Sequence, residues 1–205
     1  MFEFFVTMML IAALALLIIA LLAADRLVRR HHGQKVDFFR KHPIQPGDIV
    51  FLGDSLTDGC RWDELLPGLP VKNRGINADT TTGVLERISD ITSGKPKAIF
   101  ILIGTNDLPW FLQREDDEIL DTYEEILERI RIESPGTRVF VQSLLPRAVG
   151  YARRIKTLNH RLKRMAERRG LTYVDIHPRL CAPDGSIRPE LSNDRLHLMG
   201  GGYLI

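Results

Sequence analysis

The sequence is poor in cysteine and carries almost no excess charge. Its 2 cysteines, Cys60 and Cys181, are too few for a disulfide framework and lack the short spacing of a metal site. Its 28 basic and 26 acidic residues leave a formal net charge of +2. This balance gives no electrostatic argument for a nucleic-acid partner. The sequence also shows no internal repeat and no low-complexity stretch, which excludes repeat and fibrous architectures.

What remains is the composition of a folded globular chain, with 44% hydrophobic and 26% charged residues. A length of 205 residues allows one domain with a substantial core and a short appendage. Basic residues gather between Arg153 and Arg169, but apolar Leu158, Leu162 and Met165 are interleaved with them. This pattern predicts the solvent-exposed face of an amphipathic helix rather than a nucleic-acid surface.

The longest run without a charge covers residues 4–24 and consists mostly of Leu, Ile, Ala, Met and Phe. At about 1.5 Å per residue, such a helix is roughly 30 Å long, which is enough to cross the hydrocarbon core of a bilayer. The run therefore predicts a single N-terminal transmembrane helix. A cleaved signal peptide is the weaker alternative, because the basic segment that should precede its apolar core is absent.

Basic residues follow this run, namely Arg26, Arg29, Arg30 and Lys35. The positive-inside rule then places the rest of the chain in the cytoplasm, while export of the domain stays open. The cluster could also bind anionic lipid head groups. We interpret residues 1–33 as a transmembrane anchor with a basic juxtamembrane linker, and residues 34–205 as one folded domain.

The folded part alternates between helix-like and strand-like patterns. A short amphipathic helix is predicted at 36–42, ended by Pro43. The candidate strands that follow are residues 48–53, 70–75, 98–104, 138–144 and 172–177. Helical patterns between them cover residues 80–92, 116–134 and 151–170. Because several strands are apolar throughout, we expect a three-layer α/β domain with a five-stranded parallel sheet and right-handed crossovers.

Residues able to catalyse acyl transfer follow three of these strands and recur near the C-terminus. In open α/β sheets, sites form in the loops that leave the carboxyl ends of strands. Ser55 follows the first strand, and a serine nucleophile needs a neighbouring base. His197 could be that base, with Asp194 orienting its ring. The backbone N–H groups of Ser55 and Gly75 and the side-chain amide of Asn106 are candidate donors for an oxyanion hole.

Four sequence blocks carry these residues in order, "GDSLTDG", "NRGINADTTT", "IGTND" and "DRLHL". Together they resemble the SGNH, or GDSL, hydrolase superfamily over about residues 46–203. The segments "INADTTTGVLERI", "LLPR" and "LHLMGGGY" are most similar to the catalytic subunits of intracellular platelet-activating factor acetylhydrolases and their bacterial relatives. The resemblance implies a flavodoxin-like sheet and a serine esterase for short acyl groups that uses no metal and no cofactor.

One feature departs from that family pattern. Members generally continue past the final Gly-Tyr pair into a terminal helix, whereas this sequence stops at Ile205, eight residues after His197. The terminal helix of the domain is therefore expected to be short or missing. Either the sequence is incomplete, or the packing of that helix around the His197 turn is supplied in another way.

Other polar residues near the blocks are expected to have structural roles. Asp54 could accept a hydrogen bond beside the nucleophile, and Asp107 could hold the Asn106 loop. Asp79 and Thr80 to Thr82 are expected to cap the next helix, with contact to the substrate as the alternative. The five histidines other than His197 show no metal-ligand spacing and are expected to be surface or structural residues.

The segment that follows Asn106 is unusually apolar for a connection. Leu108, Trp110 and Phe111 could line an acyl or alcohol pocket, or they could pack against the sheet. An apolar pocket facing a nearby bilayer would suit a lipid ester of the lysophospholipid type.

The sequence thus favours a membrane-anchored serine esterase acting on short-chain, acetyl-type esters. A carbohydrate O-acetylesterase of the cell envelope is the alternative, and an open polar cleft would favour it. A non-catalytic binding module is less favoured because the set of site residues is intact. The sequence leaves the oligomeric state open.

Overall fold

Strands and helices alternate along the chain as the sequence predicts. The computed structural model describes residues 2–109 and 114–205, with side chains from residue 4 onward. The strands are β1 (Ile49–Gly53), β2 (Val71–Gly75), β3 (Ala98–Leu102), β4 (Arg138–Gln142) and β5 (Thr172–Val174). The α-helices are α1 (Phe2–Lys41), α2 (Ser55–Asp58), α3 (Trp62–Leu65), α4 (Thr81–Arg87), α5 (Ser89–Thr92), α6 (Asp116–Glu133), α7 (Ala152–Arg168) and α8 (His177–Leu180). The 3-10 turns are η1 (Thr105–Asp107), η3 (Val149–Tyr151), η4 (Pro189–Leu191) and η5 (Gly200–Leu204).

The five strands form one parallel sheet in the order β2-β1-β3-β4-β5. Every neighbouring pair is parallel, and Gly53 at the end of β1 lies opposite Gly75 of β2 and Leu102 of β3. The carboxyl ends of β2, β1 and β3 therefore meet at one edge of the sheet. This confirms the predicted five-stranded α/β fold, and it brings the loops after β1, β2 and β3 together.

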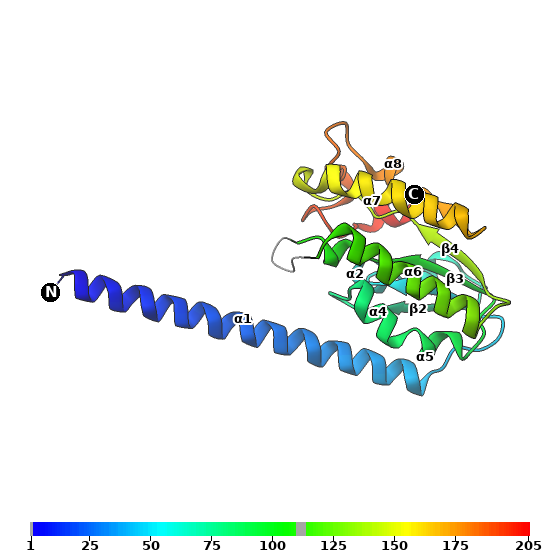
Figure 1. Ribbon diagram of the computed structural model, residues 1–205, viewed down its shortest axis with the longest axis horizontal. Helices are drawn as coiled ribbons and strands as arrows, with labels where there is room; N and C mark the ends of the chain where they lie inside the picture. The colour runs from blue at the N-terminus through cyan, green and yellow to red at the C-terminus, as the bar shows by residue number, and fades with distance from the viewer. Residues whose placement is uncertain (1, 110–113) are drawn as a thin grey trace.

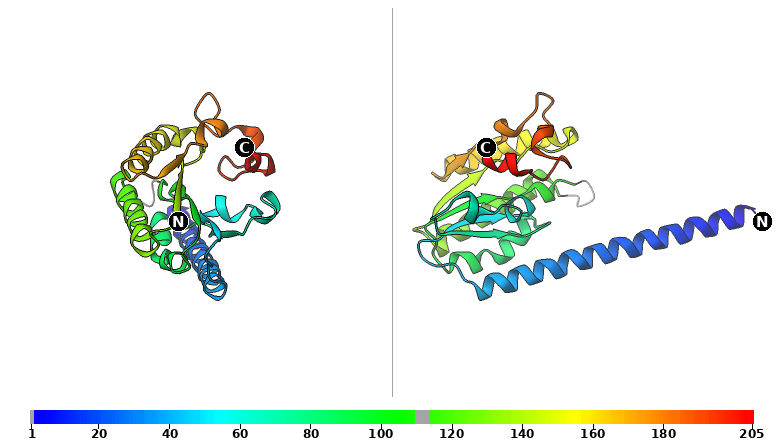
Figure 2. Two further views of the ribbon diagram at one scale, coloured as in Figure 1. Left: turned by 90° about the vertical axis from the view of Figure 1, so that its right-hand side faces the viewer. Right: turned by 180° about the vertical axis from the view of Figure 1, so that it is seen from behind.

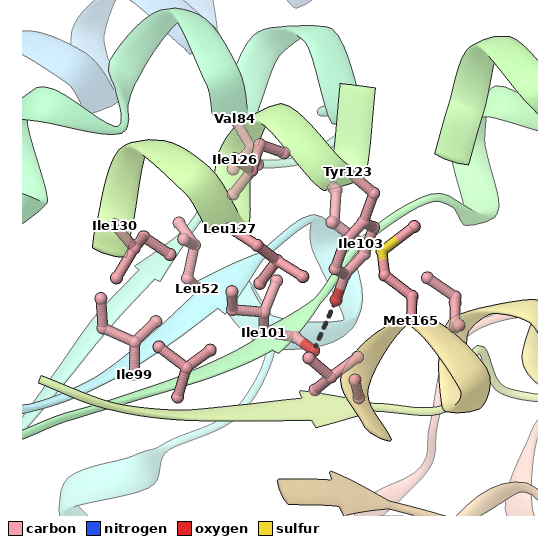
Figure 3. Close-up of a cluster of buried hydrophobic side chains, with 14 of the residues drawn as sticks. Leu52, Val84, Ile99, Ile101, Ile103, Tyr123, Ile126, Leu127, Ile130 and Met165 are labelled. Carbon is pink, nitrogen blue, oxygen red and sulfur yellow. Dashed lines mark hydrogen bonds between the residues drawn. The ribbon is translucent and has the colours of Figure 1, made fainter. Parts of the chain in front are cut away.

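One face of the sheet carries the main hydrophobic core. Aliphatic residues of β1 and β3, such as Leu52, Ile99 and Ile101, pack there against α4, α5, α6 and α7 (Figure 3). The hydroxyl of Tyr123 on α6 donates to the carbonyl oxygen of Ile101. Since these side chains are almost fully buried, this face supplies most of the apolar burial that stabilises the domain.

The other face is covered by short elements. Figure 2 shows α6 and α7 on one side of the sheet, and the α2–β2 connection and the C-terminal segment on the other. A smaller cluster there joins Leu56 of α2 and Leu102 of β3 to Leu180 and Leu191. Phe51, Phe100 and Phe140 stack along the same face, one from each of three strands.

The N-terminal helix differs from the sequence expectation. The juxtamembrane linker expected to end near residue 33 and the short helix expected at 36–42 are instead parts of the single helix α1, which ends at Lys41, two residues before Pro43 (Figure 1). Between residues 25 and 41 there is no proline, and the one glycine, Gly33, costs a helix only about 1 kcal/mol relative to alanine. That cost is too small to break a helix whose far end packs on the domain.

The apolar half of α1 is exposed, with large hydrophobic side chains from Phe4 to Leu22 facing outward. Among the described residues, α1 is the one helix long and apolar enough to cross a membrane, and a signal sequence would meet the same criteria.

Candidate active site

Ser55 is the first residue of α2, directly after β1. Asp54 caps this helix: its Oδ1 accepts a hydrogen bond from the Leu56 N–H at 2.9 Å, as the sequence predicted. Its backbone carbonyl accepts from the N–H groups of Thr57 and Asp58. Asp54 has no exposed surface, and burial raises the pKa of its carboxyl to about 7. The nucleophile candidate therefore lies in a turn with buried neighbours at the carboxyl end of β1.

His197 and Asp194 are brought to Ser55 from the far end of the chain. His197 Nε2 lies 2.9 Å from Ser55 Oγ, and His197 Nδ1 lies 2.6 Å from Asp194 Oδ2. The three side chains thus form a continuous hydrogen-bonded chain. This is the geometry in which an imidazole takes a proton from a serine while a carboxylate holds the ring in the required tautomer.

The turn that carries the two residues is held by its own hydrogen bonds. Asp194 Oδ1 accepts from the N–H groups of Leu196 at 2.9 Å and His197 at 2.8 Å. Arg195 between them has a φ of 63°, in the left-handed region. The hydrogen bond from His197 holds the pKa of Asp194 well below its usual range, so the carboxylate stays charged at neutral pH.

The C-terminal segment braces this turn against the nucleophile. Tyr203 lies in η5, and its hydroxyl donates to the Leu56 carbonyl oxygen at 2.9 Å. The Met199 N–H donates to the Leu191 carbonyl, and Leu198 packs on the cluster that contains Leu56. The residues after His197 therefore link its turn directly to α2.

Asn106 lies in η1, after β3. The chain leaves β3 through Gly104, whose φ of 121° is a conformation that side-chain-bearing residues rarely adopt. The Asn106 side-chain amide donates one hydrogen bond to the Asp79 carbonyl oxygen at 3.0 Å, which leaves its second N–H for another acceptor. Asp107 accepts from the Thr81 N–H and hydroxyl, so its predicted structural role is confirmed.

The loop after β2 is also held as the sequence indicated. The Thr80 hydroxyl caps α4 by accepting from the Gly83 N–H. The Asp79 carboxylate accepts from the Thr80 N–H and pairs with the buried Arg87 at 2.9 Å. The two residues thus fix the start of α4 and, through the Asp79 carbonyl, the side chain of Asn106.

Gly75 departs from its predicted role as an oxyanion donor. Its N–H already donates to Asn73 Oδ1 at 2.9 Å, so it is not free to bind a substrate oxygen. A Cβ at this position would lie 2.2 Å from the Asp58 backbone nitrogen. Gly75 is therefore needed for the close approach of β2 to α2. This packing could be recognised only from the structure.

Ala78 was missed by the sequence reasoning. It has a φ of 62°, which is unfavourable for a residue with a side chain, and strained conformations of this kind cluster at functional sites. Its N–H donates to no group of the described residues, and neither does that of Ser55. Ala78 directly precedes Asp79, whose carbonyl oxygen holds Asn106.

The predicted substrate pocket is only partly within the described residues. Leu108 is 2% exposed and belongs to the main hydrophobic core, so its side chain packs inside the fold and does not line a pocket. Trp110 and Phe111 lie outside the described residues. Over residues 2–109 and 114–205, no group of three or more His, Cys, Asp or Glu side chains could hold a metal ion.

A hydrogen-bonded Ser, His and Asp at the carboxyl edge of a parallel sheet is the arrangement of a serine hydrolase. The model of the GDSL-like lipase/acylhydrolase family matches residues 51–205, and the chain belongs to this family. Family and fold together identify it as an ester-hydrolysing enzyme.

Curated relatives and solved structures agree with this assignment. The chain is 30% identical over 189 residues to platelet-activating factor acetylhydrolase IB subunit alpha2 of Rattus norvegicus, covering 87% of this chain and 79% of the relative. A candidate platelet activating factor from Streptococcus pneumonia superposes with a TM-score of 0.81 at 23% identity, covering 90% of this chain and 93% of that one. A GDSL-like lipase from Bacteroides thetaiotaomicron gives 0.72 at 21% identity, covering 86% and 91%. At these identities, the two structures support the fold alone.

Proposed function

We propose that the chain is a serine esterase that works through an acyl-enzyme, with Ser55, His197 and Asp194 as its catalytic triad. The observation that carries the proposal is the hydrogen-bonded chain from Ser55 Oγ through His197 to Asp194. Ser55 Oγ attacks the ester carbonyl carbon while His197 Nε2 takes its proton. His197 then gives that proton to the leaving alkoxide. Water attacks the acyl-Ser55 with the same base, which releases the acid and restores the serine.

The oxyanion formed in both steps needs donors that point at it in advance. The Ser55 N–H and the second N–H of the Asn106 amide are unoccupied by the described residues. In place of Gly75, we assign the third donor to the Ala78 N–H, which is unpaired and adjacent to the Asp79 carbonyl that holds Asn106. The strained φ of Ala78 supports this assignment, because a functional constraint explains why the strain is kept.

The test of the mechanism is the Ser55→Ala substitution, with Ser93→Ala at an exposed position as the matched control. Turnover of p-nitrophenyl acetate by Ser55→Ala should fall at least about 10⁴-fold, because no other group in the triad can form the acyl-enzyme. Ser93→Ala should keep the rate of the parent chain. A Ser55→Ala enzyme that retains its turnover, or a fluorophosphonate probe that fails to label Ser55, would show that the triad is not catalytic. The second result would revive the non-catalytic binding module.

The substrate class we propose is a short-chain, acetyl-type ester of a lipid. The curated relatives are named as acetylhydrolases of platelet-activating factor, and the apolar helix α1 supports a lipid environment. A carbohydrate O-acetylesterase remains the second candidate, because the side chains of His197 and Asp194 are 48% and 47% exposed and an open site admits a polar sugar. Rates on acetyl, butyryl and octanoyl esters of one chromogenic alcohol, together with acetylated sugars, separate the two.

We further propose that α1 anchors the enzyme in a membrane as a single span, with a cleaved signal sequence as the alternative. Its large apolar residues from Phe4 to Leu22 are exposed. The basic residues after the span favour the cytoplasmic side, with export as the alternative. Protease accessibility of the domain in sealed vesicles tests the side, and the mass of the membrane-extracted chain tests cleavage.

A further inference from the structure

The C-terminal half of α1 is packed on the catalytic domain. Phe39 is buried, with the guanidinium of Arg74 placed 4.6 Å from the centre of its ring. Arg40 Nε lies 3.0 Å from Asp90 Oδ2 of α5. The Arg74 guanidinium also donates to the His42 carbonyl oxygen at 2.6 Å, just after the helix ends. These contacts fix the end of α1 to the β2 edge of the domain.

Two further contacts join α1 to the loops of the active site. Lys35 Nζ lies 2.5 Å from Asp58 Oδ1, at the end of the helix that Ser55 begins. His32 Nε2 lies 3.5 Å from Asp79 Oδ1, and the Asp79 carbonyl oxygen holds Asn106. The active-site loops are therefore level with residues 32–35 of α1.

These contacts also set the direction in which α1 leaves the domain. Asp90 lies in α5, beyond the end of α4, whereas Asp79 follows the carboxyl end of β2. Since α1 runs from His32 beside Asp79 to Arg40 beside Asp90, its N-terminal half projects past the carboxyl edge of the sheet. Figure 1 and the right-hand view of Figure 2 show the N-terminal half of α1 projecting on the side of the domain where α6 and α7 begin. The active site and the apolar run thus face the same way.

The part of α1 between the apolar run and the active-site loops is short. His32 is eight residues after Ala24, the last residue of the uncharged run. At 1.5 Å per residue this is about 12 Å, and the head groups occupy roughly 5–8 Å of it beyond the hydrocarbon core. With residues 4–24 across a bilayer, the site is held within several ångströms of the head groups.

We propose that α1 is a rigid spacer that holds the open side of the active site against the bilayer, so that the substrate is an ester of a lipid resident in the adjacent leaflet. This rests on the proposed esterase function and on α1 as the anchor. The surface that would meet the head groups carries basic and apolar residues, which suit contact with an anionic bilayer surface. Arg26, Arg29 and Arg30 directly follow the apolar run of α1, where the helix would leave the bilayer. The exposed Val149 lies between β4 and α7, on the side of the domain that faces the apolar run.

The first experiment changes the distance between the active site and the bilayer and leaves the residues of the active site unaltered. A seven-residue helical insert, AEAAKEA, between Leu27 and Val28 raises the domain by about 10 Å and turns it by only about 20°. The full chain is placed in vesicles of phosphatidylcholine with some phosphatidylglycerol that carry an acetylated long-chain glycerol ether. The matched control carries the same insert before the apolar run, where it leaves the height unchanged.

The insert after Leu27 should lower hydrolysis of the vesicle-borne ester by roughly tenfold or more, because the tethered site loses its effective concentration at the surface. Turnover of p-nitrophenyl acetate and of the same lipid ester in detergent micelles should stay at the parent rate, which also shows that the domain is folded. Equal vesicle rates for the insert and its control would overturn the proposal. If the parent chain hydrolyses neither ester, the esterase function itself is wrong.

The second experiment measures the orientation independently of catalysis and needs no insert. Val149→Cys and Gly136→Cys, each in a Cys181→Ser background, place one fluorescent label at opposite ends of the domain. Gly136 is exposed before the amino end of β4, and a side chain there meets no neighbour. Nitroxide-labelled head groups should quench the label at position 149 more strongly than the label at 136. Equal quenching would contradict the proposed orientation.

Discussion

The two halves of the proposed active site are held in different ways. Ser55 begins the short helix α2 at the carboxyl end of β1, and the adjacent residues Asp54, Leu56 and Thr57 are buried. His197 and Asp194 lie in a turn whose side chains are about half exposed, held by local hydrogen bonds and by the contact of Tyr203 with α2. The core thus positions the proposed nucleophile, whereas a surface turn positions the proposed base. Changes on the histidine side should affect the rate, and changes on the serine side should affect folding as well.

The largest effect expected is that of Asp194→Asn. The amide cannot hold the His197 ring in the tautomer that accepts the serine proton, so kcat should fall by about 10⁴-fold. Because the turn is exposed, the free energy of unfolding should change by no more than about 1 kcal/mol. Steady-state kinetics and urea unfolding measure the two quantities. Asp184→Asn, in another exposed turn, is the control, and a kcat for Asp194→Asn close to that of the control would contradict the triad.

Gly75→Ala tests the serine side. The added Cβ would lie 2.2 Å from the Asp58 nitrogen and 2.8 Å from the Asp54 carbonyl oxygen, both backbone atoms, so β2 or α2 must move. We expect a loss of about 1–3 kcal/mol in the free energy of unfolding, with a parallel loss of activity. Gly136→Ala meets no neighbouring atom and should be close to neutral. Equal stabilities of the two variants in urea would show that the close approach at Gly75 is unimportant.

Asp54→Asn tests the buried carboxyl group beside Ser55. Burial raises the pKa of Asp54 from 3.8 to about 7, so the folded state holds a proton that the unfolded state releases between these values. The stability contributed by that proton is complete below the unfolded pKa and is lost as the pH rises through the folded pKa.

The parent chain should therefore lose more stability than Asp54→Asn between about pH 5 and about pH 8. Urea unfolding at both values measures the difference. Asp63→Asn, at an exposed position, should behave like the parent chain. The same loss of stability in parent and Asp54→Asn chains would mean that Asp54 is charged throughout.

Tyr203→Phe should have the smallest effect. It removes the hydrogen bond to the Leu56 carbonyl, which links the histidine turn to α2, and should cost about 1 kcal/mol in stability. Because the ring stays in place, kcat should fall only severalfold and KM should change little. Kinetics on p-nitrophenyl acetate measure both. A fall as large as that of Asp194→Asn would mean that this one hydroxyl positions the base.

Much of the site could be predicted from sequence because its chemistry depends on residue types in ordered blocks. Ser55 and Asn106 were chosen as a hydroxyl and an amide after suitable strands, and Asp194 and His197 as a carboxylate and an imidazole near the C-terminus. The structure brings Ser55, Asp194 and His197 into hydrogen-bond contact. The capping role of Thr80 was also predicted correctly, because capping depends on local sequence. The structural role of Asp107 was predicted as well, although its partner, Thr81, lies 26 residues away.

The failures concern backbone approach and packing. The occupied N–H of Gly75 depends on the rotamer of Asn73, and the left-handed φ of Ala78 is not encoded by alanine itself. Leu108 was a candidate either for a pocket or for packing against the sheet, because apolar character does not tell a pocket from a core, and the structure places it in the core. The unbroken course of α1 was missed because its second half is stabilised by contacts with residues distant in sequence.

By itself, the sequence determined the alternation of strands and helices, the apolar run at the N-terminus and the chemical identity of the proposed triad. These depend on periodicity and side-chain chemistry, which are local. Only the tertiary structure decided which backbone N–H groups are free and which way the site faces along α1. The free N–H groups depend on the rotamer of Asn73 and the backbone conformation of Ala78, which residue type alone does not specify. The direction of the site is set by contacts between segments far apart in the chain, such as Lys35 with Asp58.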